Sequence, residues 1–285
     1  MDLDAAYRAC RRMQRRHDPT YYWATRRLPR ELQPAVHALY GYVRGADEIV
    51  DGPRRPSTAT ERRAALDVWE EALREGLADG RSDHPVIAAL VDAAAHHELP
   101  LEEELAIYMG SMRVDCDRVR VETREELDVY MRGSAGSVGR IMASLLGAPR
   151  QRDEDFVRLG AAFQLTNFIR DVREDWALDR MYLAREDFAR WGVREEEILR
   201  GEATAGFRAL VAEEVDRARE LFAGGAAAVA AVGPRVRPGM RMALAVYLRV
   251  LDRVERLNYD VLARRAALSP WEAGRTMLGS LRAAT

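Results

Sequence analysis

The stretch DEDFVRLGAAFQLTNFIRDVRED, residues 153–175, carries apolar residues three and four positions apart along most of its length. That spacing places the apolar side chains on one face of an α-helix. The same rhythm recurs in three other segments, residues 31–51, 61–80 and 239–268. Clear strand runs are missing, and no repeat or linker-like tract divides the chain. The sequence therefore predicts an all-α fold, with residues 1–285 forming a single domain of many packed helices.

The composition is that of an ordinary globular protein. The 285 residues include 44 Lys and Arg against 46 Asp and Glu, and a net charge of −2 argues against a nucleic-acid partner. Two cysteines, Cys10 and Cys116, are too few for a disulfide scaffold or a cysteine-based zinc site. The charged N-terminus lacks the apolar core of a signal peptide, and no apolar run could span a membrane. We therefore expect a cytoplasmic protein with at most peripheral membrane contact.

Two short acidic segments, DEIVD and DVRED, follow apolar stretches of the predicted helices. Each carries two aspartates four positions apart, Asp47 with Asp51 and Asp171 with Asp175. On a helix such a pair lies one turn apart on the same face, where like charges repel. Mg²⁺ takes oxygen ligands and typically binds one or two carboxylates together with substrate phosphates. Facing each other across a helix-bundle cavity, the two pairs could hold Mg²⁺ and a diphosphate.

An acidic helix end can also be no more than solvated surface. Here each pair follows an apolar stretch with aromatic side chains, so each lies on a helix that must be largely buried. Buried charges are costly unless they are paired or bound to metal. Arg44 lies three residues before Asp47, and Arg170 directly precedes Asp171. Because guanidinium groups bind phosphate in a bidentate manner, the whole pattern favours a metal and diphosphate site.

Four segments of the chain resemble a known family: residues 20–52, 130–147, 159–183 and 243–269. The third is the most specific, because QLTN followed by IRD and ED is hard to reach by chance. From about residue 17 to 269, the chain resembles the squalene/phytoene synthase family, and the bacterial phytoene synthases in particular. The resemblance implies an isoprenoid-synthase helical bundle around a central cavity.

The resemblance also implies an activity, that of a Mg²⁺-dependent prenyltransferase which ionises an allylic prenyl diphosphate. A second prenyl chain would capture the carbocation, so that two geranylgeranyl diphosphates give a cyclopropyl intermediate and then phytoene. Metal and arginine would neutralise the leaving diphosphate, and exclusion of water would protect the cation. We expect two or three Mg²⁺ ions with the diphosphate. Since the sequence has no dinucleotide-binding motif, we expect no NADPH.

The resemblance further assigns roles to individual residues. The residues implied to bind metal are Asp47, Glu48, Asp51, Asn167, Asp171, Glu174 and Asp175. Those implied to bind substrate are Arg44, Arg170, Arg180, Gln164, Asn167, Thr20 and Tyr21. The implied catalytic residues are Asp47, Asp51, Asp171, Asp175 and Tyr130. Two interpretations stay open beside these: Gln164 and Asn167 as ordinary buried amides, and Tyr130 as a core tyrosine with a satisfied hydroxyl.

A further polar cluster contains Arg113, Asp115 and Asp117. It resembles a family segment near the diphosphate region. Its closely spaced opposite charges favour a salt-bridged turn.

Several positions depart from the family pattern. Pro19 stands where a basic residue is usual, Arg173 and Asp179 stand where glycine is common, and Trp176 is bulkier than usual. They leave open an alternative, transfer of the prenyl group to a non-isoprenoid acceptor, such as an aromatic ring, in specialised metabolism. A third hypothesis, a non-catalytic helical binding protein, is disfavoured because all four principal aspartates are present.

Overall fold

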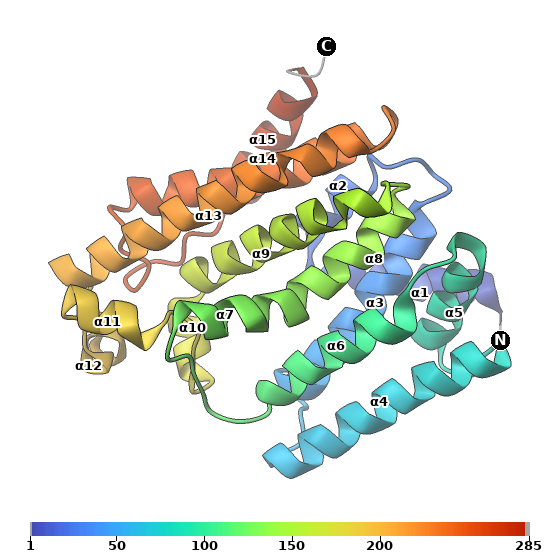
Figure 1. Cartoon of the computed structure of the whole chain (residues 1–285), viewed down its shortest axis with the longest axis horizontal. Helices are drawn as coiled ribbons and strands as arrows, with labels where there is room; N and C mark the ends of the chain where they lie inside the picture. The colour runs from blue at the N-terminus through green and yellow to red at the C-terminus, as the bar shows by residue number, and fades with distance from the viewer. Residues whose placement is uncertain (1, 283–285) are drawn as a thin grey trace.

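The computed structural model describes residues 2–282 and is a bundle of helices with almost no sheet (Figure 1). The helices are α1 Leu3–His17, α2 Pro19–Thr25, α3 Gln33–Val50, α4 Ala59–Asp79, α5 Pro85–His97, α6 Leu101–Val114, α7 Arg124–Met131, α8 Ser137–Leu145, α9 Asp153–Arg170, α10 Val172–Ala177, α11 Arg185–Trp191, α12 Glu195–Arg200, α13 Ala205–Ala231, α14 Arg237–Arg256 and α15 Pro270–Arg282. A π-helical turn, η1 Arg132–Gly136, joins α7 to α8, and a 3-10 turn, η2 Arg150–Arg152, precedes α9. Two short strands, β1 Val119–Arg120 and β2 Arg180–Met181, pair in parallel. The predicted all-α single domain is confirmed.

Local capping signals set the ends of α4. The Thr58 side chain accepts the backbone N–H of Glu61 at 3.2 Å, and the Glu61 carboxylate accepts the N–H of Thr58 at 3.0 Å. This reciprocal pair satisfies two backbone donors that the first helical turn leaves free. Gly80 ends the helix in the left-handed region, with φ of 67°, where glycine carries no steric penalty.

Two predicted helices are interrupted. The helix expected over 153–175 divides at Asp171, whose φ of −106° and ψ of 15° separate α9 from α10. The periodic stretch 239–268 is helical only as far as Arg256, because Asn258 and Tyr259 follow with φ of 53° and 59°. Left-handed backbone cannot continue a right-handed helix, so the chain changes direction there. Apolar spacing continues across both breaks, and it therefore could not reveal them.

Helix α9 lies in the middle of the bundle, against α8 and η1 on one side and α13 on the other (Figure 1). Glycines allow the close contact of α9 with α8 and η1. A Cβ added to Gly160 would lie 2.5 Å from the carbonyl oxygen of Ala135, and one added to Gly139 would lie 2.5 Å from that of Phe156. The two backbones therefore touch, which fixes α9 at a close distance from α8.

The exposed sides of the long helices carry charged residues throughout, including the arginines and glutamates of α4 and α13. Among the residues described, no helix combines the length and the apolar character that a membrane span requires.

The Gly160→Ala substitution should destabilise the fold by about 1–3 kcal/mol, because its methyl group would have to push two backbones apart. Gly110→Ala in α6 is the matched control, since a Cβ there meets no atom within 4 Å. An alanine at that exposed helical position should stabilise by about 0.5–1 kcal/mol. Urea unfolding of both variants measures the difference. Equal stability of the two variants would contradict the close packing of α9 on η1.

Candidate active site

The two acidic segments lie at the ends of α3 and α9. Asp47 is in the last turn of α3, and Asp51 follows that helix with its backbone N–H 2.7 Å from the Asp47 carbonyl. Asp171 separates α9 from α10, and its carbonyl accepts the N–H of Asp175 at 2.9 Å. Within each segment the two aspartates are therefore one helical turn apart.

A buried arginine joins these segments to the rest of the site. Arg180 in β2 is 5% exposed, and its Nη2 lies 2.5 Å from Oδ1 of Asp51. It also donates to the backbone carbonyl of Asp115 at 2.6 Å. The strand pairing holds this position, because the N–H of Val119 donates to the carbonyl of Asp179 at 3.2 Å. A guanidinium can serve several acceptors at once, so Arg180 connects parts of the chain that are distant in sequence.

Asp115 is a buried carboxylate bound by two tyrosines. The hydroxyl of Tyr130 donates to its Oδ2 at 2.5 Å, and the hydroxyl of Tyr182 donates to its Oδ1 at 2.7 Å. Burial raises the pKa of Asp115 to about 6, although Arg180 and the two hydroxyls favour the ionised form. Tyr130, predicted to be catalytic, thus has its hydroxyl engaged by a carboxylate.

The sequence predicts that residues 113–117 form a salt-bridged turn. That prediction is correct for Arg113 and Asp117, which both form salt bridges. Arg113 lies 2.6 Å from Asp67, and Asp117 pairs with Arg63. The prediction missed Asp115, which is turned inward. The family resemblance points to the diphosphate region, but the local charges favour a salt-bridged turn, because the partners of Asp115 come from elsewhere in the chain.

Asp47 and Asp175 are two carboxylates whose surroundings disfavour their charged form. Burial, followed by nearby Asp51 and Asp115, raises the pKa of Asp47 to about 7 despite the opposing effect of nearby arginine. Burial, followed by nearby Asp171, raises the pKa of Asp175 to about 8, and Asp51 and Asp115 add to it. Since Asp175 is affected by Asp51, the two acidic segments converge on the same region.

The surroundings of Asp171, unlike those of Asp47 and Asp175, favour the charged carboxylate. Arg170 donates to both its oxygens, at 2.8 and 2.5 Å, and Arg265 donates to its Oδ1 at 2.7 Å. Burial disfavours the charge, yet the two arginines outweigh it and hold the pKa of Asp171 below its usual range. Arg265 lies between α14 and α15, within the family-like segment 243–269, but the sequence analysis assigned it no role because its partner Asp171 is 94 residues away.

The two predicted metal-binding glutamates are each paired with an arginine. Glu48 pairs with Arg44 one turn earlier on α3. Glu174 lies 3.3 Å from Arg265 and is half exposed. Arg44 and Arg170 therefore both lie at this end of the bundle, as does Arg180, each beside a carboxylate.

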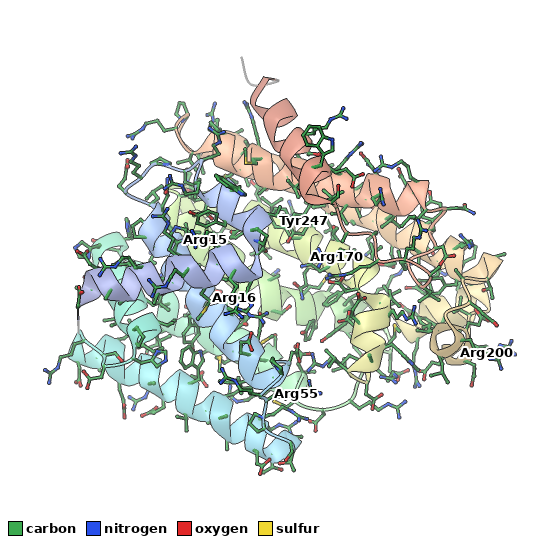
Figure 2. All side chains as sticks on the ribbon, turned by 180° about the vertical axis from the view of Figure 1, so that it is seen from behind. Arg15, Arg16, Arg55, Arg170, Arg200 and Tyr247 are labelled. Atoms are coloured by element: carbon green, nitrogen blue, oxygen red, sulfur yellow. The ribbon has the colours of Figure 1, made fainter. Side chains whose placement is uncertain are left out.

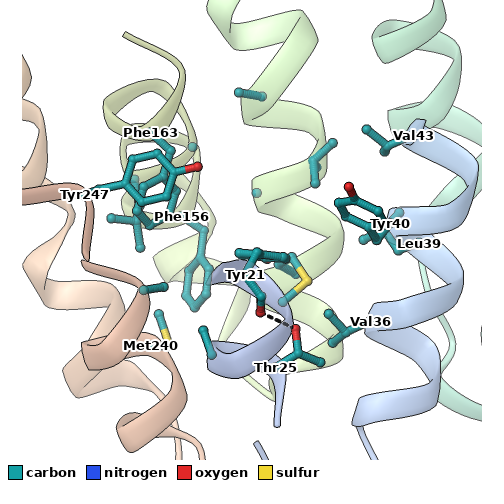
Figure 3. A pocket seen from close by; sticks show the side chains of 18 of the residues that line it. Tyr21, Thr25, Val36, Leu39, Tyr40, Val43, Phe156, Phe163, Met240 and Tyr247 are labelled. Atoms are coloured by element: carbon teal, nitrogen blue, oxygen red, sulfur yellow. Dashed lines mark hydrogen bonds between the residues drawn. The ribbon is translucent and has the colours of Figure 1, made fainter. Parts of the chain in front are cut away.

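An apolar cavity of about 270 Å³ lies between α2, α3, α8, α9 and α14, lined largely by aliphatic and aromatic side chains (Figure 3). Three residues predicted to contact substrate or metal line it: Tyr21, Gln164 and Asn167. Thr20 and Tyr130 are not part of this lining. Tyr130 packs instead against Phe168 and Tyr182.

The cavity ends directly below the acidic segments. On α3 its last lining residue is Val43, one helical turn before Asp47. On α9 its last lining residue is Asn167, one turn before Asp171. Arg170 and Tyr247 lie close together at this end, toward the middle of the molecule (Figure 2). An apolar chain in the cavity would thus have its polar head among the carboxylates and arginines.

The side-chain atoms that could bind a metal at the acidic end of the cavity are oxygens, which suits a hard cation. The Oδ1 atom of Asn167 is buried without a hydrogen-bond partner, and Asp47 and Asp175 carry raised pKa values. Within residues 2–282, no three His, Cys, Asp or Glu side chains are grouped closely enough to hold a metal ion alone. The side chains therefore fit Mg²⁺ that takes part of its coordination from water and phosphate oxygens.

A helical bundle with this apolar cavity and acidic end has the isoprenoid-synthase fold. The model of the squalene/phytoene synthase family matches residues 14–272, and the chain belongs to that family. The resemblance read from the sequence is thereby confirmed. Members of this family are prenyltransferases, and the chain is an enzyme of that class.

Individual relatives agree with this assignment. The chain is 34% identical over 281 residues to a phytoene synthase of Arthrospira platensis, across 94% of this chain and 89% of the relative. It is 35% identical over 277 residues to a 15-cis-phytoene synthase of Synechocystis sp., across 93% and 81%. A squalene synthase from Alicyclobacillus acidocaldarius superposes with a TM-score of 0.81 at 30% identity, across 90% of this chain and 96% of that one. A dehydrosqualene synthase crystallised with a ligand has the same fold, with a TM-score of 0.90 at 24% identity, across 99% and 97%.

The Asp115→Asn substitution should destabilise the protein by about 1–3 kcal/mol. An amide has one acceptor oxygen, so one of the two tyrosine hydroxyls would lose its partner inside the protein. Asp117→Asn is the control, because its ion pair with Arg63 is exposed and should contribute at most about 1 kcal/mol. Thermal unfolding followed by circular dichroism compares them. A melting temperature of Asp115→Asn as high as that of the control would show that Asp115 does not bind both tyrosines.

Proposed function

We propose that this chain condenses two molecules of geranylgeranyl diphosphate head to head, through a cyclopropyl intermediate, to give phytoene. The observation that carries the proposal is the convergence of two acidic segments and three arginines at one end of an apolar cavity. Two relatives at 34 and 35% identity are named phytoene synthase and 15-cis-phytoene synthase, which supports this product.

The residues proposed to hold Mg²⁺ are Asp47, Asp51, Asn167, Asp171 and Asp175, with Glu48 and Glu174 beside them. When bound, the metal supplies positive charge that stabilises diphosphate as a leaving group. Two of these carboxylates have raised pKa values because they lie buried near other carboxylates. That surplus of negative charge is the structural support for a cation site here.

The arginines have a second role. Arg44, Arg170 and Arg180 lie beside the carboxylates, where their guanidinium groups can bind diphosphate oxygens. Burial of Arg180 strengthens such contacts, because a low-dielectric environment screens charge less than water does.

The cavity protects the carbocation. Aliphatic side chains such as Val36 and Leu39 exclude water, which would otherwise trap the cation as an alcohol. Rings of Phe163 and Tyr247, with centroids 4.5 Å apart, line the same space, and their faces can stabilise positive charge.

Product analysis tests the proposal. The purified protein is incubated with geranylgeranyl diphosphate and Mg²⁺, without NADPH, and the extract is analysed by mass spectrometry. We expect phytoene and released diphosphate, and no turnover when a chelator is present. Turnover in excess chelator would refute the role of the metal. A prenylated aromatic compound formed only when a cell extract is added would refute head-to-head condensation and support transfer to a non-isoprenoid acceptor.

The Asp175→Asn substitution should lower kcat by about 10²–10³-fold, because a ligand that stabilises the departing diphosphate is lost. It should not lower the melting temperature. Burial, followed by crowding by Asp171, raises the pKa of Asp175 from 3.8 to about 8, so the carboxyl lowers the stability of the fold as the pH rises from about 4 to 8, and the amide removes this cost.

Asp179→Asn, four residues later, is the matched control. Asp179 is exposed and has φ of 59°, a left-handed conformation that asparagine tolerates well. Steady-state kinetics and thermal melting of both variants complete the test. Near-normal kcat in a folded Asp175→Asn variant would contradict a role for this carboxylate in the site.

A further inference from the structure

Asp18 is a carboxylate at the cavity that no motif pointed to. It is the N-cap of α2, where its Oδ1 accepts the backbone N–H of Tyr21 at 2.8 Å. It also lines the apolar cavity, and it is the only Asp or Glu among the lining residues described. Placing a carboxylate beside a largely apolar lining is costly, and the hydrogen bond from Tyr21 offsets only part of that cost.

The groups around Asp18 place it at the end of the cavity nearest the acidic segments. It lies close enough to Arg170 for that arginine to favour its ionised form, while burial raises its pKa. Burial, followed by the negative charge of Asp18, raises the pKa of Tyr40 and of Tyr247. The rings of both tyrosines face the cavity (Figure 3). Asn167 and Tyr247 line the cavity together with Asp18, and Asn167 marks the same end of α9.

This is the end at which the reacting carbons must lie. In a prenyl diphosphate, the carbon that becomes cationic is the one bonded to the diphosphate. If the diphosphate binds among Arg170, Arg180 and the acidic segments, the cationic carbons lie at the top of the cavity and the apolar tails lie deeper. Asp18 is therefore beside the reacting carbons rather than beside the tails.

We propose that the Asp18 carboxylate accepts the proton that is lost in the last step of the reaction. This role rests on the proposed function. The final allylic cation of the C40 chain loses one proton from the carbon next to the cationic centre. The electron pair of that C–H bond becomes the new carbon–carbon π bond, and the proton forms an O–H bond on the carboxylate of Asp18. No oxidant or reductant takes part, and the acid later releases its proton to water.

Two features favour Asp18 over other bases. Tyr130 does not line the cavity, and its hydroxyl already donates to Asp115 at 2.5 Å. Asp18 is half-buried, and a carboxylate with a raised pKa is a stronger base than an ordinary exposed one. A purely structural role, capping α2, remains the competing explanation, and the choice of variants must separate the two.

Asp18→Asn and Asp18→Ser make that separation. Asparagine and serine are both good N-caps, so α2 and the melting temperature should be preserved, while neither can accept the proton as a carboxylate does. Asp216→Asn on the exposed side of α13 is the control for loss of one negative charge. Each full-length protein is incubated with geranylgeranyl diphosphate and Mg²⁺. Phytoene, the cyclopropyl diphosphate intermediate and C40 alcohols are then quantified separately from released diphosphate.

We expect the ratio of phytoene to intermediate and alcohols to fall on the order of 10²-fold in both Asp18 variants, with diphosphate release much less affected. The Asp216 control should keep the wild-type ratio. An unchanged ratio in folded Asp18 variants, even with lower total turnover, would overturn the proposal and leave Asp18 as a helix cap. A wild-type chain that consumes substrate without forming phytoene would instead overturn the proposed function, and this role with it.

Discussion

The contact of Arg180 with Asp51 and Asp115 is the interaction on which the site depends. It joins β2, the end of α3 and the segment after α6, which are far apart in the sequence. Burial, followed by the charges of neighbouring carboxylates, raises the pKa of Asp47 and Asp175 despite the nearby arginines. The fold thus tolerates an excess of buried negative charge at one end. Such an arrangement stabilises little by itself, but it prepares the site for a cationic partner.

The rest of the bundle supplies the opposite environment. Glycines let α9 approach η1 and α8 at backbone distance, which closes one wall of the cavity with small residues. The cavity begins one helical turn below the acidic segments on both α3 and α9. The same two helices therefore carry the apolar wall and the acidic end, and their rigidity fixes the distance between the two. Because one helical turn separates the last lining residue from the first aspartate on each helix, the polar end stays apart from the apolar interior.

The sequence predicted what local periodicity encodes. Apolar spacing correctly indicated α3, α4 and most of α9, and four-residue spacing placed the aspartates of each acidic segment one turn apart. It could not predict the break at Asp171, because the apolar pattern continues through it. Asp115 and Arg265 were also missed as members of the site, since their partners lie 67 and 94 residues away. Such contacts exist only once the helices are packed.

The positions that depart from the family pattern have clear structural roles around the site. Arg173 donates to the carbonyl of Leu262 at 3.3 Å, in the segment that carries Arg265. Trp176 lies under the guanidinium of Arg120, 4.6 Å from the ring centroid. Neither residue lines the cavity, so neither takes space from a substrate in it. Pro19 is different, because it occupies the first turn of α2, directly after its N-cap. Pro19 thus starts α2 directly beside the carboxylate of Asp18 at the edge of the cavity, so the start of this helix fixes where that carboxylate lies.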